Sequence, residues 1–206
     1  MDFITVMEWV GTVAFAVSGA VVAIEKELDW YGIGFLAIIT AIGGGIVRDL
    51  LINRDLPASL ADPTYAIVSV VTAIAVIFFY KRIDKIKHLV SIADGIGLAA
   101  FTAIGCKVAV ASGHPGFYVT ITLAVLTGTF GGVIRDVFVV ETPRCFRREV
   151  YAMASIIGAI AFDIVHNYAY FSIGLSMYVC FGVTLAIRLL AIYKNIHLGK
   201  VQLEKI

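Results

Sequence analysis

The chain has 206 residues, of which 60% are hydrophobic and only 15% are charged, and its mean hydropathy is +0.95. This composition excludes a soluble domain of ordinary surface polarity and predicts an all-α integral membrane protein. The net charge of +1 gives no reason to expect a nucleic-acid partner. No nucleotide loop, paired His/Cys ligand set or nucleophile elbow is present, so we expect no enzyme activity, no metal site and no cofactor.

Seven apolar segments follow one another along the chain, each long enough to cross a bilayer core about 30 Å thick. They are continuously apolar and do not alternate with polar residues, which predicts helices and not barrel strands. The predicted spans are residues 3–24, 31–52, 64–80, 89–111, 117–139, 150–167 and 171–193.

The basic residues of the loops are concentrated on one side of the membrane. With seven spans, the N-terminus shares a side with the loops after spans 2, 4 and 6, which contain Arg54 alone. The remaining loops and the C-terminal tail contain Lys26, Lys81, Arg82, Lys85, Lys87, Arg144, Arg147, Arg148, Lys194, Lys200 and Lys205. The positive-inside rule therefore predicts an external N-terminus and a cytoplasmic C-terminus.

The sequence repeats itself at an offset of about 87 positions. The stretch from Gly43 to Asp49, GGGIVRD, matches the stretch from Phe130 to Asp136, FGGVIRD. Because each half has an odd number of spans, the second half must cross the membrane in the opposite direction, as in inverted-repeat transporters and channels. The predicted organisation is a first three-helix repeat (1–88), an inverted second repeat (89–168), and a seventh helix with a basic cytoplasmic tail (169–206).

Glycines interrupt spans 2 and 5 at matching positions. Glycine weakens a helix by roughly 1 kcal/mol relative to alanine, so these spans are expected to be broken and to expose carbonyl groups to a permeating ion. The alternative is close helix packing, in which glycine makes room for a neighbouring backbone. Threonine hydroxyls nearby either line a polar path or bond back to their own helix. The candidate helix-break and pore residues are Gly43, Gly44, Gly45, Gly128, Gly131, Gly132, Thr40, Thr127 and Thr129.

Charged residues inside the spans suggest two sites. Adjacent residues do not share a helix face, so neither arginine of the repeated motif is expected to pair with the aspartate that follows it. Symmetry instead predicts a first cluster on the external side and a second cluster on the cytoplasmic side, which could act as gates. The first cluster is Glu8, Arg48 and Asp49, and the second cluster is Asp94, Arg135 and Asp136. Lys107 could reach the interface or line a pore, and Arg188 is expected to reach the cytoplasmic head groups.

These motifs resemble the prokaryotic branch of the TRIC family of trimeric intracellular cation channels, which overlaps a bacterial membrane family with duplicated glycine-rich domains. The resemblance covers nearly the whole chain and rests on Gly43-Gly44-Gly45 and Gly131-Gly132, each followed by Arg-Asp. It implies a homotrimer in a prokaryotic plasma (inner) membrane, in contact with lipid. Each subunit would contain a pore beside spans 2 and 5 that conducts potassium or sodium, with bound lipid as a further ligand.

Two other functions stay open at this point. Inverted repeats with interrupted helices are equally typical of secondary transporters, here for a small solute such as a small amino acid. A structural membrane protein without flux would leave the matched glycines unexplained. Arg48 and Arg135 argue against cation flow unless they are paired or move aside.

Overall fold

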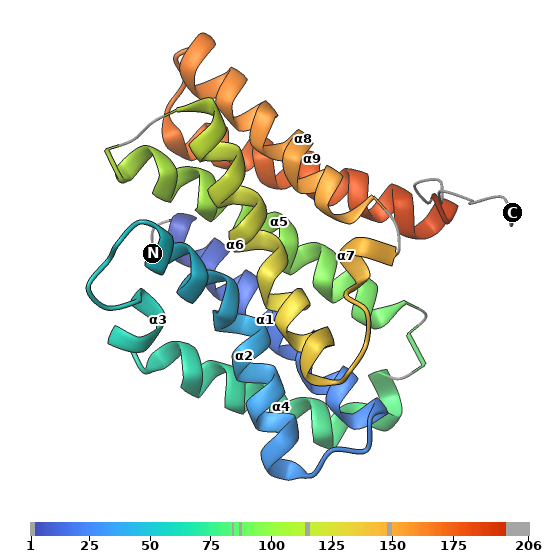
Figure 1. Ribbon diagram of the computed structural model, residues 1–206. Coiled ribbons are helices and arrows are strands. Elements are labelled where there is room, and N and C mark those ends of the chain that lie inside the picture. Colours follow the sequence, from blue (N-terminus) through green and yellow to red (C-terminus); the bar gives the residue numbers. More distant parts are fainter. Residues whose placement is uncertain (1–2, 84, 87, 114–115, 148–149, 197–206) are drawn as a thin grey trace, which may run out of the picture.

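The computed structural model describes residues 3–83, 85–86, 88–113, 116–147 and 150–196, and all regular elements in these residues are helices (Figure 1). They are α1 (Phe3–Glu25), α2 (Trp30–Leu51), α3 (Ala58–Ala61), α4 (Thr64–Ile83), α5 (Leu89–Ala111), α6 (Phe117–Phe138), α7 (Arg144–Arg147), α8 (Tyr151–Asp163) with a π-helical turn (Ile164–Tyr168), and α9 (Ile173–Lys194). Much of the predicted basic tail (197–206) lies outside the described residues, as do Lys87 and Arg148.

Six of these helices are long and apolar enough to cross a membrane, namely α1, α2, α4, α5, α6 and α9. The chain is therefore an all-helical membrane protein, as its composition predicted. The expected span 150–167 is helical, but it divides into α8 and the π-helical turn. The count of seven spans and the side on which each terminus lies stay predictions. The short helices α3 and α7 were not predicted, because four residues carry no periodic pattern.

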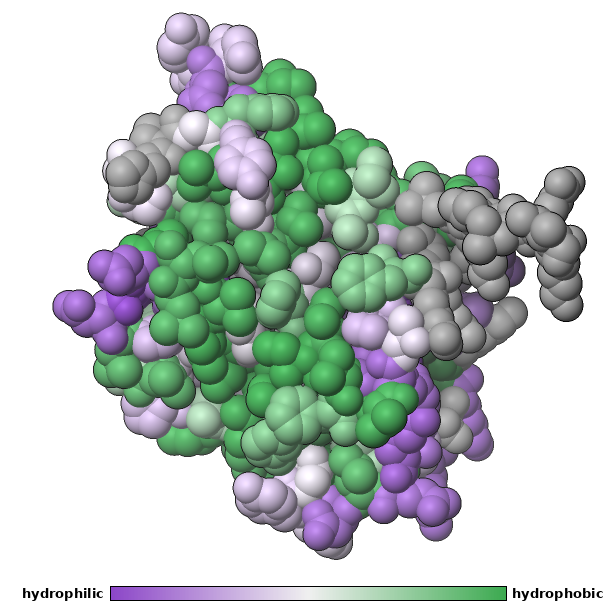
Figure 2. Space-filling view, in the orientation of Figure 1, coloured by the Kyte–Doolittle hydropathy of each residue, from purple (hydrophilic) through white to green (hydrophobic). Residues whose placement is uncertain are grey.

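The helices form a bundle in which α1 and α5 contact each other at the centre (Figure 1). In their most apolar stretches, 67% of the residues of α1 and 78% of those of α5 are buried, against 17% for α4. Helix α4 lies at one edge and turns Val71 and Phe78 outward, with 60% and 73% of their surface exposed. Figure 2 shows a broad apolar surface with hydrophilic residues gathered toward its edges. Such a surface suits lipid or another subunit.

The two halves of the chain make equivalent contacts. Helices α1, α2 and α4 pack on one another, and so do α5, α6 and α8. A Cβ placed on Gly19 of α1 would lie 2.6 Å from the Leu36 carbonyl oxygen, and one on Gly105 of α5 would lie 2.7 Å from the Leu123 carbonyl oxygen. These positions match at the offset found in the sequence, so the repeat has a counterpart in three dimensions.

The contacts between α2 and α6 are reciprocal. A side chain on Gly44 would collide with the carbonyl oxygen of Thr127, and one on Gly131 would collide with the carbonyl oxygen of Thr40. As residue numbers rise along α2 they fall along α6, so the two helices cross antiparallel. This is the mutual orientation that an inverted repeat requires.

The prediction that spans 2 and 5 are broken at their glycines is wrong. Helix α2 runs without interruption from Trp30 to Leu51, and α6 from Phe117 to Phe138. Glycine lowers helix propensity, but tertiary packing supplies most of the stability of a helix inside a protein. Here the missing Cβ atoms let two backbones touch, as the close-packing alternative proposed, and a pore role for these glycines stays a prediction.

Candidate functional site

The second cluster is a closed network around Arg135, which lies near the end of α6. Its Nη1 donates to Oδ1 of Asp94 at 2.6 Å and to the hydroxyl of Ser18 at 2.5 Å, while its Nε donates to Oδ1 of Asp136 at 2.8 Å. The hydroxyl of Ser18 in turn donates to Asp94. The Arg135 side chain is fully buried, and its two carboxylates are almost so. The structure therefore brings together Asp94, Arg135 and Asp136, the three residues that symmetry grouped.

The first cluster has equivalent residues but different contacts. Arg48 Nε donates to Oδ1 of Asp49 at 2.7 Å. Glu8 instead accepts a hydrogen bond from the Tyr65 hydroxyl at 3.1 Å. Within the part of the chain that the structure describes, Asp49 is the one carboxylate that pairs with Arg48. Glu8 therefore lies in the same site as Arg48 without neutralising it.

Both arginines pair with the aspartate that follows them, so the prediction against such pairing is wrong. The arginine side chain is long enough to turn around the helix, and a glycine three residues earlier leaves space for it. A Cβ on Gly45 would lie 3.8 Å from Nη2 of Arg48, and one on Gly132 would lie 3.7 Å from Nη2 of Arg135. Ordinary van der Waals distance at both positions shows that a guanidinium lies directly over each glycine.

The two aspartates also fasten the loops that follow α2 and α6. Oδ2 of Asp49 accepts from the backbone N–H of Ala58 at 2.8 Å, and Oδ2 of Asp136 accepts from that of Arg144 at 2.9 Å. These N–H groups belong to the starts of α3 and α7. Each aspartate thus joins its arginine to the next segment of chain, which gives it a structural role in addition to its charge.

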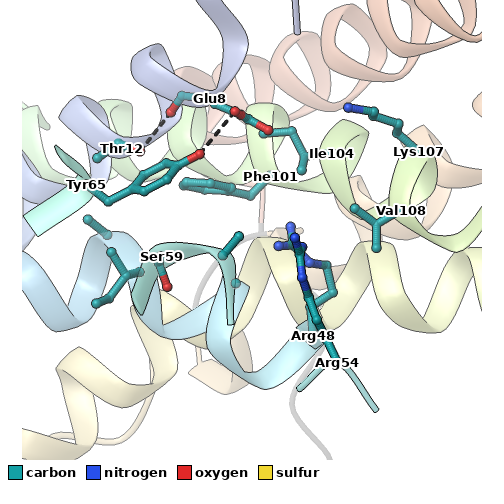
Figure 3. Close-up of a pocket in the computed structure, with 14 residues that line it drawn as sticks. Glu8, Thr12, Arg48, Arg54, Ser59, Tyr65, Phe101, Ile104, Lys107 and Val108 are labelled. Carbon is teal, nitrogen blue, oxygen red and sulfur yellow. Dashed lines mark hydrogen bonds between the residues drawn. The ribbon is translucent and has the colours of Figure 1, made fainter. Parts of the chain in front are cut away.

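A cavity of about 150 Å³ opens beside the first cluster (Figure 3). Arg48 points into it from α2, and Lys107 reaches it from α5. That Lys107 lines a pore stays a prediction. Arg54 adds a third cation, and Glu8 with Tyr65 forms part of the opposite wall. Asp49 pairs with Arg48 and lies 3.7 Å from Arg54, and Glu8 adds a second carboxylate. Three cations against two carboxylates leave this part of the protein with an excess positive charge.

The predicted pore residues on α2 and α6 are used in packing. The hydroxyls of Thr40, Thr127 and Thr129 donate to the carbonyl oxygens four residues earlier, at 2.6, 2.5 and 2.7 Å. The backbone-bonding alternative is therefore what the structure contains. Gly43 faces Ile134, and Gly128 faces Thr102.

Sequence reasoning missed three residues of the site: Tyr65, Tyr151 and Ser18. The repeat could have identified the tyrosines, since they occupy equivalent positions beside Glu8 and Arg135. The expectation that Arg188 reaches the head groups is wrong: it is 2% exposed, and its guanidinium lies 4.6 Å from the centre of the Tyr151 ring. A cation over an aromatic face is favourable when both are removed from water.

The chemistry that this site offers is electrostatic. Among the described residues, no group of three or more His, Cys, Asp or Glu side chains is placed to hold a metal ion. Cys106, Cys145 and Cys180 are free thiols. The antiparallel crossing of α2 and α6 puts the two arginines beyond opposite ends of their glycine contact. The site is therefore a pair of fixed-charge clusters with a tightly packed helix crossing between them.

Comparison with known protein families gives two matches within this chain. The family model described as Glycine transporter matches residues 5–81 and again residues 91–167. The chain is 36% identical over 204 residues to the UPF0126 inner membrane protein YadS of Escherichia coli K12, covering 97% of this chain and 96% of that protein. It is 39% identical over 154 residues to the UPF0126 membrane protein YvgT of Bacillus subtilis, covering 73% and 75% of the two chains.

Solved structures resemble this one over their full length. A TRIC cation channel, studied for the structural basis of its conductance, superposes with a TM-score of 0.91 at 30% identity, and the match covers 100% of both chains. The TRIC trimeric intracellular cation channel orthologue from Rhodobacter sphaeroides superposes with a TM-score of 0.88 at 29% identity, covering 95% of this chain and 100% of that one.

Proposed function

Because this chain belongs to the prokaryotic branch of the TRIC family, together with the bacterial UPF0126 membrane proteins, we propose that it is a cation channel of the prokaryotic plasma membrane. The sequence-based recognition of this family is thereby confirmed. The observation that carries the channel function is the full-length structural agreement with a TRIC cation channel. Potassium, with sodium as a second monovalent cation, is the proposed permeant ion.

The proposed pore runs through one subunit, from the cavity at the first cluster, past the crossing of α2 and α6, to the second cluster. Two observations support this path: polar and charged side chains gather at both ends of the crossing, and they belong to equivalent positions of the repeat. In this conformation the contact at Gly44 and Gly131 and the pair of Arg135 with Asp94 close the path. Conduction would therefore require these contacts to separate, which makes the clusters gates.

The proposed assembly is a homotrimer with one pore in each subunit. Support comes from the family, since the Rhodobacter sphaeroides relative is named a trimeric channel. The apolar outward face of α4 offers surface for lipid or for a neighbouring subunit. The N-terminus is proposed to be external and the C-terminus cytoplasmic, with repeats at 1–88 and 89–168 and the seventh helix and tail at 169–206.

A secondary transporter for a small amino acid is the second candidate. The family model that matches both halves is described as Glycine transporter. The tight crossing of α2 and α6 also suits a carrier, which needs a closed barrier beside its site in every state. Both candidates use the same cavity and the same clusters, so flux measurements must separate them.

The test is current through purified protein in a planar bilayer under a potassium gradient. Discrete unitary steps that reverse near the potassium equilibrium potential are expected for the channel. Lys107→Glu should raise cation conductance, because it replaces a cation by an anion in the proposed path. The matched control is Lys194→Gln, which removes an exposed cation at the end of α9 and should leave conductance unchanged.

Silence in the bilayer would overturn the channel proposal if the same preparation took up glycine into proteoliposomes with saturation. Unitary steps that Lys107→Glu leaves unaltered would retain the channel and reject the path through the cavity.

A further inference from the structure

The two clusters differ in how many carboxylates their arginines hold. Arg135 contacts Asp136 through Nε and Asp94 through Nη1, at 2.8 and 2.6 Å. Arg48 repeats the first of these contacts with Asp49, at 2.7 Å, but in the described residues it has no second carboxylate. The position that a second carboxylate occupies in one half of the chain corresponds, in the other half, to the cavity in front of Arg48.

The side chain that could fill this position is held elsewhere. Glu8 is the counterpart of Asp94, but its carboxylate accepts a hydrogen bond from Tyr65. In the second half the counterpart tyrosine, Tyr151, makes no such bond: its hydroxyl is buried without a hydrogen-bond partner in the described part of the chain. In the first half the acidic residue, Glu8, is held by tyrosine, whereas its counterpart in the second half, Asp94, is held by arginine.

The cavity itself matches a small anion with an apolar end. Lys107 lines it and is paired with no carboxylate among the described residues, and the Ser59 hydroxyl is buried there without a hydrogen-bond partner. Phe101 and Ile104 supply an apolar wall. A volume of about 150 Å³ accommodates on the order of ten water-sized spheres, which is enough for a molecule of four or five heavy atoms.

We propose that this cavity binds a small aliphatic monocarboxylate, of the size of acetate or propionate. Its carboxylate takes the place at Arg48 that Asp94 takes at Arg135, with Lys107 as a second cation, and its alkyl end contacts Phe101. A guanidinium is suited to hold two carboxylates through different edges, because its five N–H groups form a fixed planar fork. Arg48 is 7% exposed and lines the cavity, and a carboxylate that binds there in the folded state alone stabilises the folded protein.

This inference extends beyond flux, and equilibrium binding tests it without an ion gradient. In a Trp30→Phe background, Trp9 is the remaining tryptophan, and its ring centre lies 5.1 Å from that of Tyr65 at the cavity wall. Purified protein in detergent is titrated with sodium acetate or propionate that replaces sodium chloride at constant ionic strength. The expected result is a saturable change in Trp9 fluorescence and a rise in melting temperature, because a ligand that binds the folded state stabilises it.

Lys107→Gln should weaken the apparent affinity by about tenfold or more, as expected for the loss of one charged hydrogen bond, and Lys107→Arg should restore it. Arg48→Lys keeps the charge but loses the planar fork, so it should weaken binding. The lysine can still pair with Asp49, so the variant should fold. Lys194→Gln, the matched control, should bind as the unaltered chain does.

Three results would overturn the proposal: a response without saturation, an affinity that Lys107→Gln does not change, or binding of glycine in the absence of any acetate or propionate response. The last result would show that the site needs an ammonium group, for which Glu8 is the partner. None of these results depends on whether the protein conducts ions, so the failure of this inference and that of the channel proposal are distinguishable.

Discussion

The first and second clusters begin from nearly the same residues and reach different states. Each has an Arg-Asp pair at the end of a helix, an acidic residue on the preceding central helix, and a tyrosine. In the second cluster the acidic residue pairs with arginine and the network is sealed from solvent. In the first cluster the acidic residue pairs with tyrosine, and arginine faces a cavity.

The two clusters differ in the length of the acidic side chain, by one methylene group, and in the hydroxyl that lies beside it. Asp94 is short and meets Arg135 beside the Ser18 hydroxyl, which also binds both of them. Glu8 is longer and meets Tyr65. A buried arginine and carboxylate tolerate little mismatch, because desolvation of both charges must be offset by good geometry. Two halves of one sequence can therefore pair their charged residues differently while keeping the same charges.

Neutralising the two acidic residues separately should give the largest difference between the clusters. Asp94→Asn should lower the free energy of unfolding by about 3–5 kcal/mol, because it removes one partner of a buried ion pair. Glu8→Gln should cost less than about 1 kcal/mol, because the Tyr65 hydroxyl can still donate to the amide oxygen. Denaturant titration of both variants in detergent measures the difference, and equal losses would show that the two clusters are not distinct in state.

The helix crossing provides the next largest effect. Gly131→Ala should destabilise the protein by about 1–3 kcal/mol, because its methyl group would overlap the Thr40 carbonyl oxygen and push α2 from α6. Gly34→Ala in α2 is the control: no atom lies within 4 Å of the added Cβ, so the variant should gain up to about 1 kcal/mol from helix propensity. Thermal unfolding of both variants measures this, and a neutral Gly131→Ala would contradict the packing role.

The two tyrosines offer a smaller and matched test. Tyr65→Phe removes a hydrogen bond to a carboxylate and should cost about 0.5–1.5 kcal/mol. Tyr151→Phe removes a buried hydroxyl that has no hydrogen-bond partner in the described residues, so it should be neutral or slightly stabilising. Unfolding midpoints of the pair decide the matter. A larger loss for Tyr151→Phe would mean that the second cluster uses its tyrosine as the first one does.

The loops after the clusters can be compared by thiol labelling, which perturbs the fold least. Burial, with a contribution from the charge of Asp136, raises the pKa of Cys145 to about 11. Its labelling by maleimide should therefore be slow at neutral pH and accelerate about tenfold per pH unit up to that value.

In the first half, Ala58 lies one position before the counterpart of Cys145, and it lines the cavity with Arg48 and Arg54. In a Cys145→Ser background, Ala58→Cys should react faster than Cys145 at neutral pH, because neighbouring cations favour the thiolate. Equal rates would indicate that the cavity is not positively charged around Ala58.

Several features could be read from the sequence alone. Apolar segment length determined the six long helices, because a helix is the structure that satisfies its own backbone in lipid. The offset between GGGIVRD and FGGVIRD predicted equivalent helix contacts, which the structure contains at Gly19 and Gly105. Grouping Asp94 with Arg135 also followed from the repeat, because a buried charge requires a partner of opposite sign.

Tertiary structure decided the rest. Helix propensity suggested breaks at Gly44 and Gly131, but the approach of two backbones, which no local pattern encodes, keeps α2 and α6 intact. The pairing of Arg48 with Asp49 depends on how far a long side chain turns over Gly45, and not on the spacing of helix faces. The difference between the clusters depends on which side chain lies within hydrogen-bond distance of each carboxylate, tyrosine for Glu8 and arginine for Asp94. Only the packed arrangement of α1, α4 and α5 sets those distances.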